Sequence, residues 1–181
     1  KTEKVDYQFF TAFDLVNQSH VKNDYAFINR TNDYVIDDRC VFFIGQPLVN
    51  LGVVDEKYYL AYMRSIVDYF RGKKFIYICH RRDNKEYISQ LSNKLGFEYR
   101  EFDNILEVEI VNMYSRPGVY ASFYSTALYN INRMFSNIEC IAFEIDKSNI
   151  SKKYLEILDI NKYYSEFRDN NIFVKNIERD R

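Results

Sequence analysis

Tryptophan is absent from this chain, and histidine, proline, glycine and cysteine are all scarce. The cysteines, Cys40, Cys79 and Cys140, are widely spaced in apolar runs and form no CxxC pair. We therefore expect buried reduced thiols rather than disulfides or zinc ligands. No apolar run has the length of a membrane span, and no signal peptide is visible. These absences argue against a secreted disulfide-rich domain and an integral membrane protein, and they favour a cytoplasmic location.

Neither sign of charge is in excess, because Lys and Arg number 25 against 26 Asp and Glu. Proteins that bind nucleic acids or membrane surfaces normally carry a large basic excess, so we expect no nucleic-acid partner. No GxxxxGKS/T sequence occurs, which argues against a P-loop kinase. A DxD-type metal motif in a strand-end context is also absent, because Asp37 and Asp38 lie in a polar, turn-prone stretch.

Apolar runs and helix-like stretches alternate along most of the chain. The runs, β-branched or aromatic and of buried-strand length, are 41–44, 75–78, 119–123 and 138–143. The helix-like stretches are 56–71, 85–95 and 126–135, with a shorter strand at 99–103 and helices at 106–112 and 151–167. This alternation predicts an α/β fold, a Rossmann-like, mostly parallel sheet with helices on both faces.

Residues 1–40 differ in composition from the rest. They are polar and rich in Asn and Asp after a strand candidate at 7–13. We interpret residues 1–40 as an interdomain connection or the remnant of a partner domain, and residues 41–181 as the Rossmann-like domain. The chain starts at Lys1 without an initiator Met, so we expect it to be a fragment or a processed form.

Ligands of open parallel sheets bind at the carboxyl ends of the strands. The first such place follows residues 41–44, where Gly45 would allow close backbone approach to a ligand and Gln46 could hold a hydroxyl or phosphate oxygen. Taken alone, this segment is better explained as a plain strand-to-loop turn.

The second place is the HRR sequence at 80–82, directly after the strand at 75–78. His80 could donate to a phosphate or protonate a leaving phosphate oxygen, and Arg81 adds positive charge beside it. The alternative is a surface loop with two solvated arginines. The other histidine, His20, lies in a polar stretch with no supporting group.

The third place combines the hydroxyls of Ser122, Ser125 and Thr126 with the start of a helix. Such a cluster can form a phosphate cradle, although a helix cap alone would explain one hydroxyl. Glu107, which follows the strand at 99–103, could bind both ribose hydroxyls. Its alternative is a solvated position on a helix face.

In order along the chain, these motifs resemble a known family. FIGQP at 43–47, HRR at 80–82, Glu107 and the pattern P-x4-S-F-x-S-T-A-L at 117–128 resemble the bacterial lipooligosaccharide and capsule sialyltransferases. That group is glycosyltransferase family 52, related to the polysialyltransferases. The match runs from Val41 to Phe143 and implies that the chain is the C-terminal half of a two-domain GT-B enzyme.

The resemblance also implies roles for residues. His80 would contact the CMP phosphate and act as general acid, Ser125 and Thr126 would bind that phosphate, and Glu107 would hold the ribose. The general base would be Asp55 or its neighbour Glu56. Where related sialyltransferases have Pro after the histidine, this chain has Arg81, which leaves the donor nucleotide open.

The implied reaction is inverting, metal-independent transfer of sialic acid from CMP-sialic acid to a surface glycan, with no cofactor. The protein would work in the bacterial cytoplasm or peripherally at the inner face of the membrane. Two alternatives remain open: the same fold with a UDP-sugar donor, and a non-catalytic nucleotide-binding module. If the partner half supplies the acceptor site, this chain alone should bind nucleotide without transferring sugar. A homodimer that exchanges residues 1–40 is also conceivable.

Overall fold

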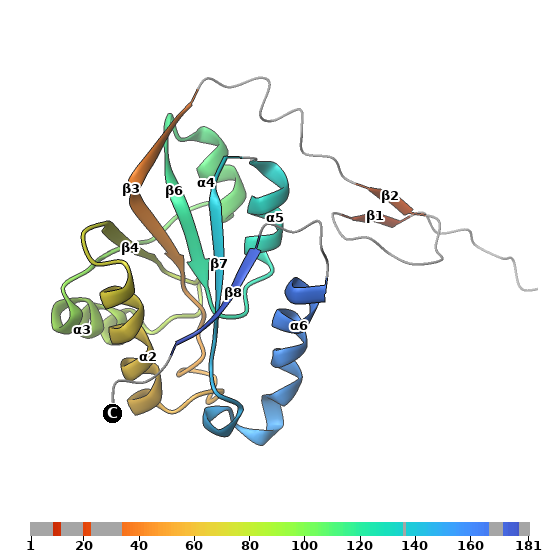
Figure 1. The fold of residues 1–181 in the computed structure, drawn as a ribbon. Coiled ribbons are helices and arrows are strands. Elements are labelled where there is room, and N and C mark those ends of the chain that lie inside the picture. The colour runs from red at the N-terminus through yellow and green to blue at the C-terminus, as the bar shows by residue number, and fades with distance from the viewer. Residues whose placement is uncertain (1–8, 12–19, 23–33, 136, 167–171, 178–181) are drawn as a thin grey trace, which may run out of the picture.

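Six parallel strands form one sheet at the centre of the structure, a computed structural model that describes residues 9–11, 20–22, 34–135, 137–166 and 172–177. The strand order is β5-β4-β3-β6-β7-β8 (Figure 1). The bounds are β3 Val35–Ile44, β4 Lys74–Ile78, β5 Glu98–Arg100, β6 Ser115–Ser122, β7 Glu139–Glu144 and β8 Ile172–Asn176. The predicted Rossmann-like arrangement is confirmed, and the four predicted apolar runs are neighbouring parallel strands.

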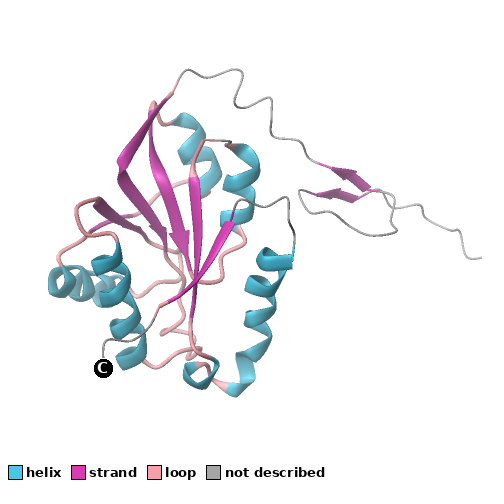
Figure 2. Cartoon of the chain, in the orientation of Figure 1, coloured by secondary structure: helices cyan, strands magenta, loops and turns pink. Residues whose placement is uncertain are grey.

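Helices cover both faces of this sheet (Figure 2). The α-helices are α2 Glu56–Tyr69, α3 Lys85–Leu95, α4 Leu106–Asn112, α5 Ala127–Met134 and α6 Leu158–Glu166, and two 3-10 helices span Lys147–Asn149 and Lys152–Ile157. Helices α2 and α3 lie on one side, and α4, α5 and α6 lie on the other (Figure 1). On β3, Phe43 packs into the first layer and Phe42 into the second. Burial of both faces explains why the strands are continuously apolar.

Strand β3 begins earlier than the apolar run predicts. Its first half, from Val35, pairs with β6 alone, because β4 begins only opposite Cys40. A register shift lies between Asp37 and Val41. The polar residues 37–39 therefore belong to a strand rather than a turn, and the proposed boundary at residue 40 falls within β3.

Some of the remaining helices and strands have the predicted bounds and others do not. Helices α3 and α4 have the predicted bounds, and Gly96 ends α3 with a left-handed φ of 74°. The tail segment is a 3-10 helix followed by α6 rather than one helix, and β8 was not predicted. Of the strand candidate at 7–13, residues 9–11 are described; they form β1 (Phe9–Thr11), which pairs in parallel with β2 (His20–Lys22). No helix in the described ranges is long and apolar enough to cross a membrane.

The cysteines are free, as expected: Cys40 and Cys140 are buried and Cys79 is partly buried. Burial raises the pKa of Cys79 to about 12, so its thiol stays protonated at neutral pH.

One buried cation fixes the position of α4. Arg116 of β6 is 1% exposed and donates to the carbonyls of Ile110, Val111 and Met113 at 2.9, 2.8 and 3.2 Å. These are carbonyls at the carboxyl end of α4, where a cation is favoured by the helix dipole. The guanidinium also lies over the ring of Phe135 at 4.6 Å. Arg116 thus ties α4 to the sheet at the end opposite to Glu107.

Candidate functional site

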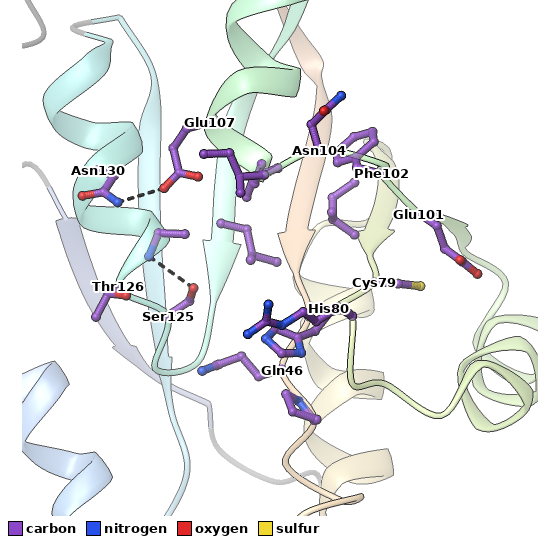
Figure 3. A pocket seen from close by; sticks show the side chains of 18 of the residues that line it. Gln46, Cys79, His80, Glu101, Phe102, Asn104, Glu107, Ser125, Thr126 and Asn130 are labelled. Atoms are coloured by element: carbon purple, nitrogen blue, oxygen red, sulfur yellow. Dashed lines mark hydrogen bonds between the residues drawn. The ribbon is translucent and has the colours of Figure 1, made fainter.

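A pocket of about 790 Å³ opens at the carboxyl ends of the central strands (Figure 3). Its volume lies in the range of small-molecule sites. The predicted site residues that line it are Gly45, Gln46, His80, Arg81, Glu107, Ser125 and Thr126. Residues about 80 positions apart in the chain therefore meet because the strands they follow are adjacent and parallel.

Gly45 is required by packing against a side chain of the protein itself. A Cβ at this position would lie 2.5 Å from the ring and hydroxyl of Tyr77. The Gly45 N–H continues the sheet by donating to the Ile78 carbonyl at 2.8 Å. Packing against Tyr77 therefore requires glycine at this position, and close approach of a ligand to Gly45 stays a prediction.

Gln46 and Ser122 hold the ends of β3 and β6 together. The Gln46 Oε1 accepts from the Tyr124 N–H at 2.8 Å and from the Ser122 hydroxyl at 3.3 Å. The Ser122 hydroxyl is buried and also donates to the Ile44 carbonyl at 2.8 Å. Gln46 lines the pocket and Ser122 does not, so the structure shows Ser122 in a contact between strands and its contact with a ligand stays a prediction.

His80 lies in a tight turn directly after β4. The Asp83 N–H donates to the His80 carbonyl at 2.8 Å, and the Arg82 N–H donates to the His80 Nδ1 at 3.1 Å. Because Nδ1 is an acceptor, the neutral ring carries its proton on Nε2. Burial lowers the pKa of His80, Asp83 opposes that effect, and the two arginines add to it. In the ligand-free chain His80 is thus favoured as a neutral hydrogen-bond donor.

The hydroxyl pair at the start of α5 lies across the pocket from His80 (Figure 3). The Ser125 Oγ accepts from the Ala127 N–H at a long 3.3 Å. Thr126 occupies the N-cap position, yet its side chain is exposed and makes no capping hydrogen bond. Helix capping therefore explains Ser125 weakly and does not explain the Thr126 hydroxyl.

Glu107 contributes a carboxylate from the first turn of α4. The Asn130 side-chain N–H donates to its Oε1 at 2.8 Å, and both residues line the pocket (Figure 3). Sequence reasoning missed Asn130. The available signal was its spacing, because Asn130 is four residues after Thr126 and so lies on the same face of α5.

The two candidate base residues are placed differently. Asp55 precedes α2, is exposed, and lines neither the main pocket nor its neighbour. Glu56 lines a second cavity of about 150 Å³, which shares Gln46 and Pro47 with the main pocket. The structure thus brings Glu56, rather than Asp55, to the edge of the predicted site.

The remaining charges of the pocket are mixed. Lys85 forms an ion pair with Glu101, and Asp103 and Arg81 complete the charged lining. Within the described part of the chain, no group of three or more His, Cys, Asp or Glu residues could hold a metal ion.

Comparison with known proteins found one family model that matches the part of the chain containing this pocket. The family model described as alpha-2,8-polysialyltransferase matches residues 2–144. Every residue that lines the main pocket lies inside that match. No curated protein matches the chain. Because the family model covers most of the sequence, the chain belongs to the alpha-2,8-polysialyltransferase family.

Proposed function

We propose that the pocket binds CMP-sialic acid and that the protein transfers sialic acid to a glycan acceptor with inversion. The observation that carries this proposal is the convergence of His80, Ser125, Thr126 and Glu107 around one pocket at the carboxyl edge of the sheet. A polysialyltransferase family supports a glycosyltransferase that uses a nucleotide sugar and a glycan. We also propose that this chain is the C-terminal half of a GT-B enzyme. The acceptor would be a glycan of lipooligosaccharide or capsule.

The phosphate of the donor would lie between the two sides of the pocket. His80 would donate from Nε2 on one side, and the hydroxyls of Ser125 and Thr126 would donate from the other. Glu107, held by Asn130, would accept from the ribose hydroxyls. These donors would take up the phosphate charge without a metal ion, so metal independence stays a prediction.

The proposed reaction is a single displacement. The acceptor hydroxyl oxygen attacks the anomeric carbon of sialic acid and its proton passes to a carboxylate, for which Glu56 is the better placed candidate. The bond from the anomeric carbon to the phosphate oxygen breaks, and the electron pair stays on CMP. His80 stabilises that oxygen by hydrogen bonding. Full proton donation requires Nδ1 to take up a proton and to release the Arg82 N–H.

Binding of CMP tests the proposal directly. With CMP at about 100 times its Kd, stabilisation of about 2.7 kcal/mol should raise the melting temperature of a chain of this size by roughly 5–10 °C. A thermal-shift panel of CMP, CDP, UDP and GDP provides the measurement. A larger shift with UDP would contradict the proposed donor and favour a UDP-sugar, and no shift with any nucleotide would contradict the site.

The hydroxyls of α5 should matter more for ligand binding than for folding. Ser125→Ala combined with Thr126→Ala should raise the Kd for CMP by roughly 10²–10⁴-fold, because two hydrogen bonds to a charged group are lost and each is worth about 1.5–3 kcal/mol. The same variant should lose less than about 1 kcal/mol of unfolding free energy, since only the long Ser125 bond is a cap.

Asn84→Ala is the matched control for this variant. Asn84 caps α3 by accepting from the Tyr87 N–H at 3.1 Å, and it does not line the main pocket. The control should lose about 1 kcal/mol of stability and keep its affinity for CMP. Full CMP affinity in the double variant, measured by calorimetry, would reduce Ser125 and Thr126 to structural residues.

A further inference from the structure

A chain of polar contacts runs beneath the His80 turn, from two buried tyrosines to the partly buried Asp83. The hydroxyls of Tyr59 on α2 and Tyr77 on β4 lie 3.2 Å apart, and both side chains are almost fully buried. The Tyr77 hydroxyl donates to Asp83 Oδ2 at 3.2 Å, and the His80 backbone N–H donates to the same oxygen at 2.7 Å. The chain of contacts thus connects the helix α2, the strand β4 and the turn that presents His80 to the pocket.

The Tyr77 ring is held firmly in this chain. It stacks between Phe43 and Phe97, with centroid distances of 5.7 and 6.0 Å and interplanar angles of 27° and 25°. Gly45 lies against the same ring, and any larger residue there would meet its hydroxyl at 2.5 Å. The donor to Asp83 therefore has little freedom to move, and the FIGQP segment is coupled to the HRR turn through Tyr77.

The ionised form of Asp83 costs the folded chain stability. Both of its hydrogen-bond donors are neutral, and in the described ranges no Lys or Arg forms a salt bridge with it. Burial raises the pKa of Asp83, which the bonds from His80 and Tyr77 only partly offset. A folded-state pKa above the unfolded value means that the native chain binds more protons, so stability decreases as pH rises through that window. A neutral amide at this position would avoid the cost.

We propose that Asp83 is a positioning residue for His80, which holds the turn in shape and uses its carboxylate charge to favour the protonated imidazole. This inference rests on the proposed function, in which negative charge forms on the phosphate oxygen of CMP. The charges that act on His80 from its own turn are Asp83, Arg81 and Arg82. The charged groups on the other pocket walls are Glu107, Asp103 and the Lys85–Glu101 pair.

The signs of these effects define the expected result. Arg81 and Arg82 lower the pKa of His80 and Asp83 raises it. Asp83→Asn keeps an oxygen that can accept from both donors but removes the charge. The titration midpoint of His80 should therefore move to lower pH, while the melting temperature at pH 7 stays unchanged or rises.

The chain is well suited to this measurement because it has two histidines. In a His20→Gln background the imidazole NMR signal of His80 stands alone and can be titrated without ligand. Tyr87→Phe is the matched control, since it removes a hydroxyl from the same region that has no hydrogen-bond partner in the described part of the chain. The midpoint of His80 should stay at its original value in this control.

A second measurement needs no change at Asp83. With Asp labelled at its carboxyl carbon, the Asp83 signal should titrate above the usual Asp range, as its raised pKa requires. The His80 ring signal should then show a second inflection at the Asp83 midpoint, because coupled groups sense each other's charge. An unchanged His80 midpoint in Asp83→Asn, or a missing second inflection, would overturn the proposal.

Activity separates positioning from a merely structural role. In the natural full-length protein, Asp83→Asn should lower kcat more than it raises KM, and the pH profile of kcat should shift to lower pH with the His80 midpoint. A normal profile would overturn the proposal. A shifted His80 midpoint in a chain that fails to bind CMP would contradict the proposed function and support the link between Asp83 and His80. Tight CMP binding with an unshifted His80 midpoint would contradict the role of Asp83 and leave the proposed function intact.

Discussion

Replacement of His80 with alanine is expected to lower the rate of sialic acid transfer by about 10²–10⁴-fold and to leave the melting temperature nearly unchanged. His80 is positioned by its own turn and by the end of β4, so its imidazole contributes little to the core. Its Nε2–H is the donor available to a leaving phosphate oxygen. The rate of CMP release from CMP-sialic acid in the natural full-length protein provides the measurement, with His20→Ala as control.

Two companion measurements sharpen this prediction. His80→Asn keeps a donor but cannot give up a proton, so it should recover CMP affinity better than it recovers rate.

Because the pKa of His80 is lowered in the folded chain, the native state binds fewer protons than the unfolded state. Wild-type stability should therefore rise with pH from the lowered pKa up to the unfolded value of about 6.5, and His80→Ala should lack that rise. A well-folded His80→Ala protein with normal turnover would rule out the catalytic role.

A second large effect is expected at Glu56. Glu56→Gln should lower transfer by about 10²–10⁴-fold and leave the Kd for CMP unchanged, because the amide keeps the shape of the side chain but cannot accept the acceptor proton. Glu56 lines the cavity that adjoins the main pocket at Gln46 and Pro47. Deprotonation of the acceptor should thus occur beside the anomeric carbon rather than at the nucleotide.

Asp55→Asn is the control that the chain itself provides. Asp55 is adjacent in sequence, has the same charge and is exposed like Glu56, but it lies outside both cavities. The variant should retain most of its transfer activity. Loss of transfer in Asp55→Asn with normal transfer in Glu56→Gln would assign the base to Asp55 and contradict the role of Glu56.

Much of the fold was predictable because its central strands are buried on both faces. Burial on both sides requires a continuous apolar run, as at β4 and β7, and such runs are visible in a sequence. The first half of β3 could not be predicted from the apolar runs, because it is not buried and carries three consecutive charged residues, 37–39. Strand β8 was missed because it is a short edge strand with Phe173 exposed, which gives no clear periodicity.

The candidate site was predictable to the extent that it depends on strand order. His80 and Ser125 were expected at one edge of the sheet, and both line the main pocket. Ser122 donates to the Ile44 carbonyl of the neighbouring strand and does not line the pocket, and a sequence does not reveal whether a strand-end hydroxyl points to a ligand or to a strand. Asn130 and Asp83 were missed because each depends on contacts with Glu107 and His80 that only the folded chain creates.

A crystal structure of the chain with CMP would test directly whether this pocket binds the donor nucleotide. The phosphate should lie within hydrogen-bond distance of His80 Nε2 and of the Ser125 or Thr126 hydroxyl, with the ribose beside Glu107. CMP bound elsewhere, or bound with its phosphate away from His80, would contradict the proposed donor site.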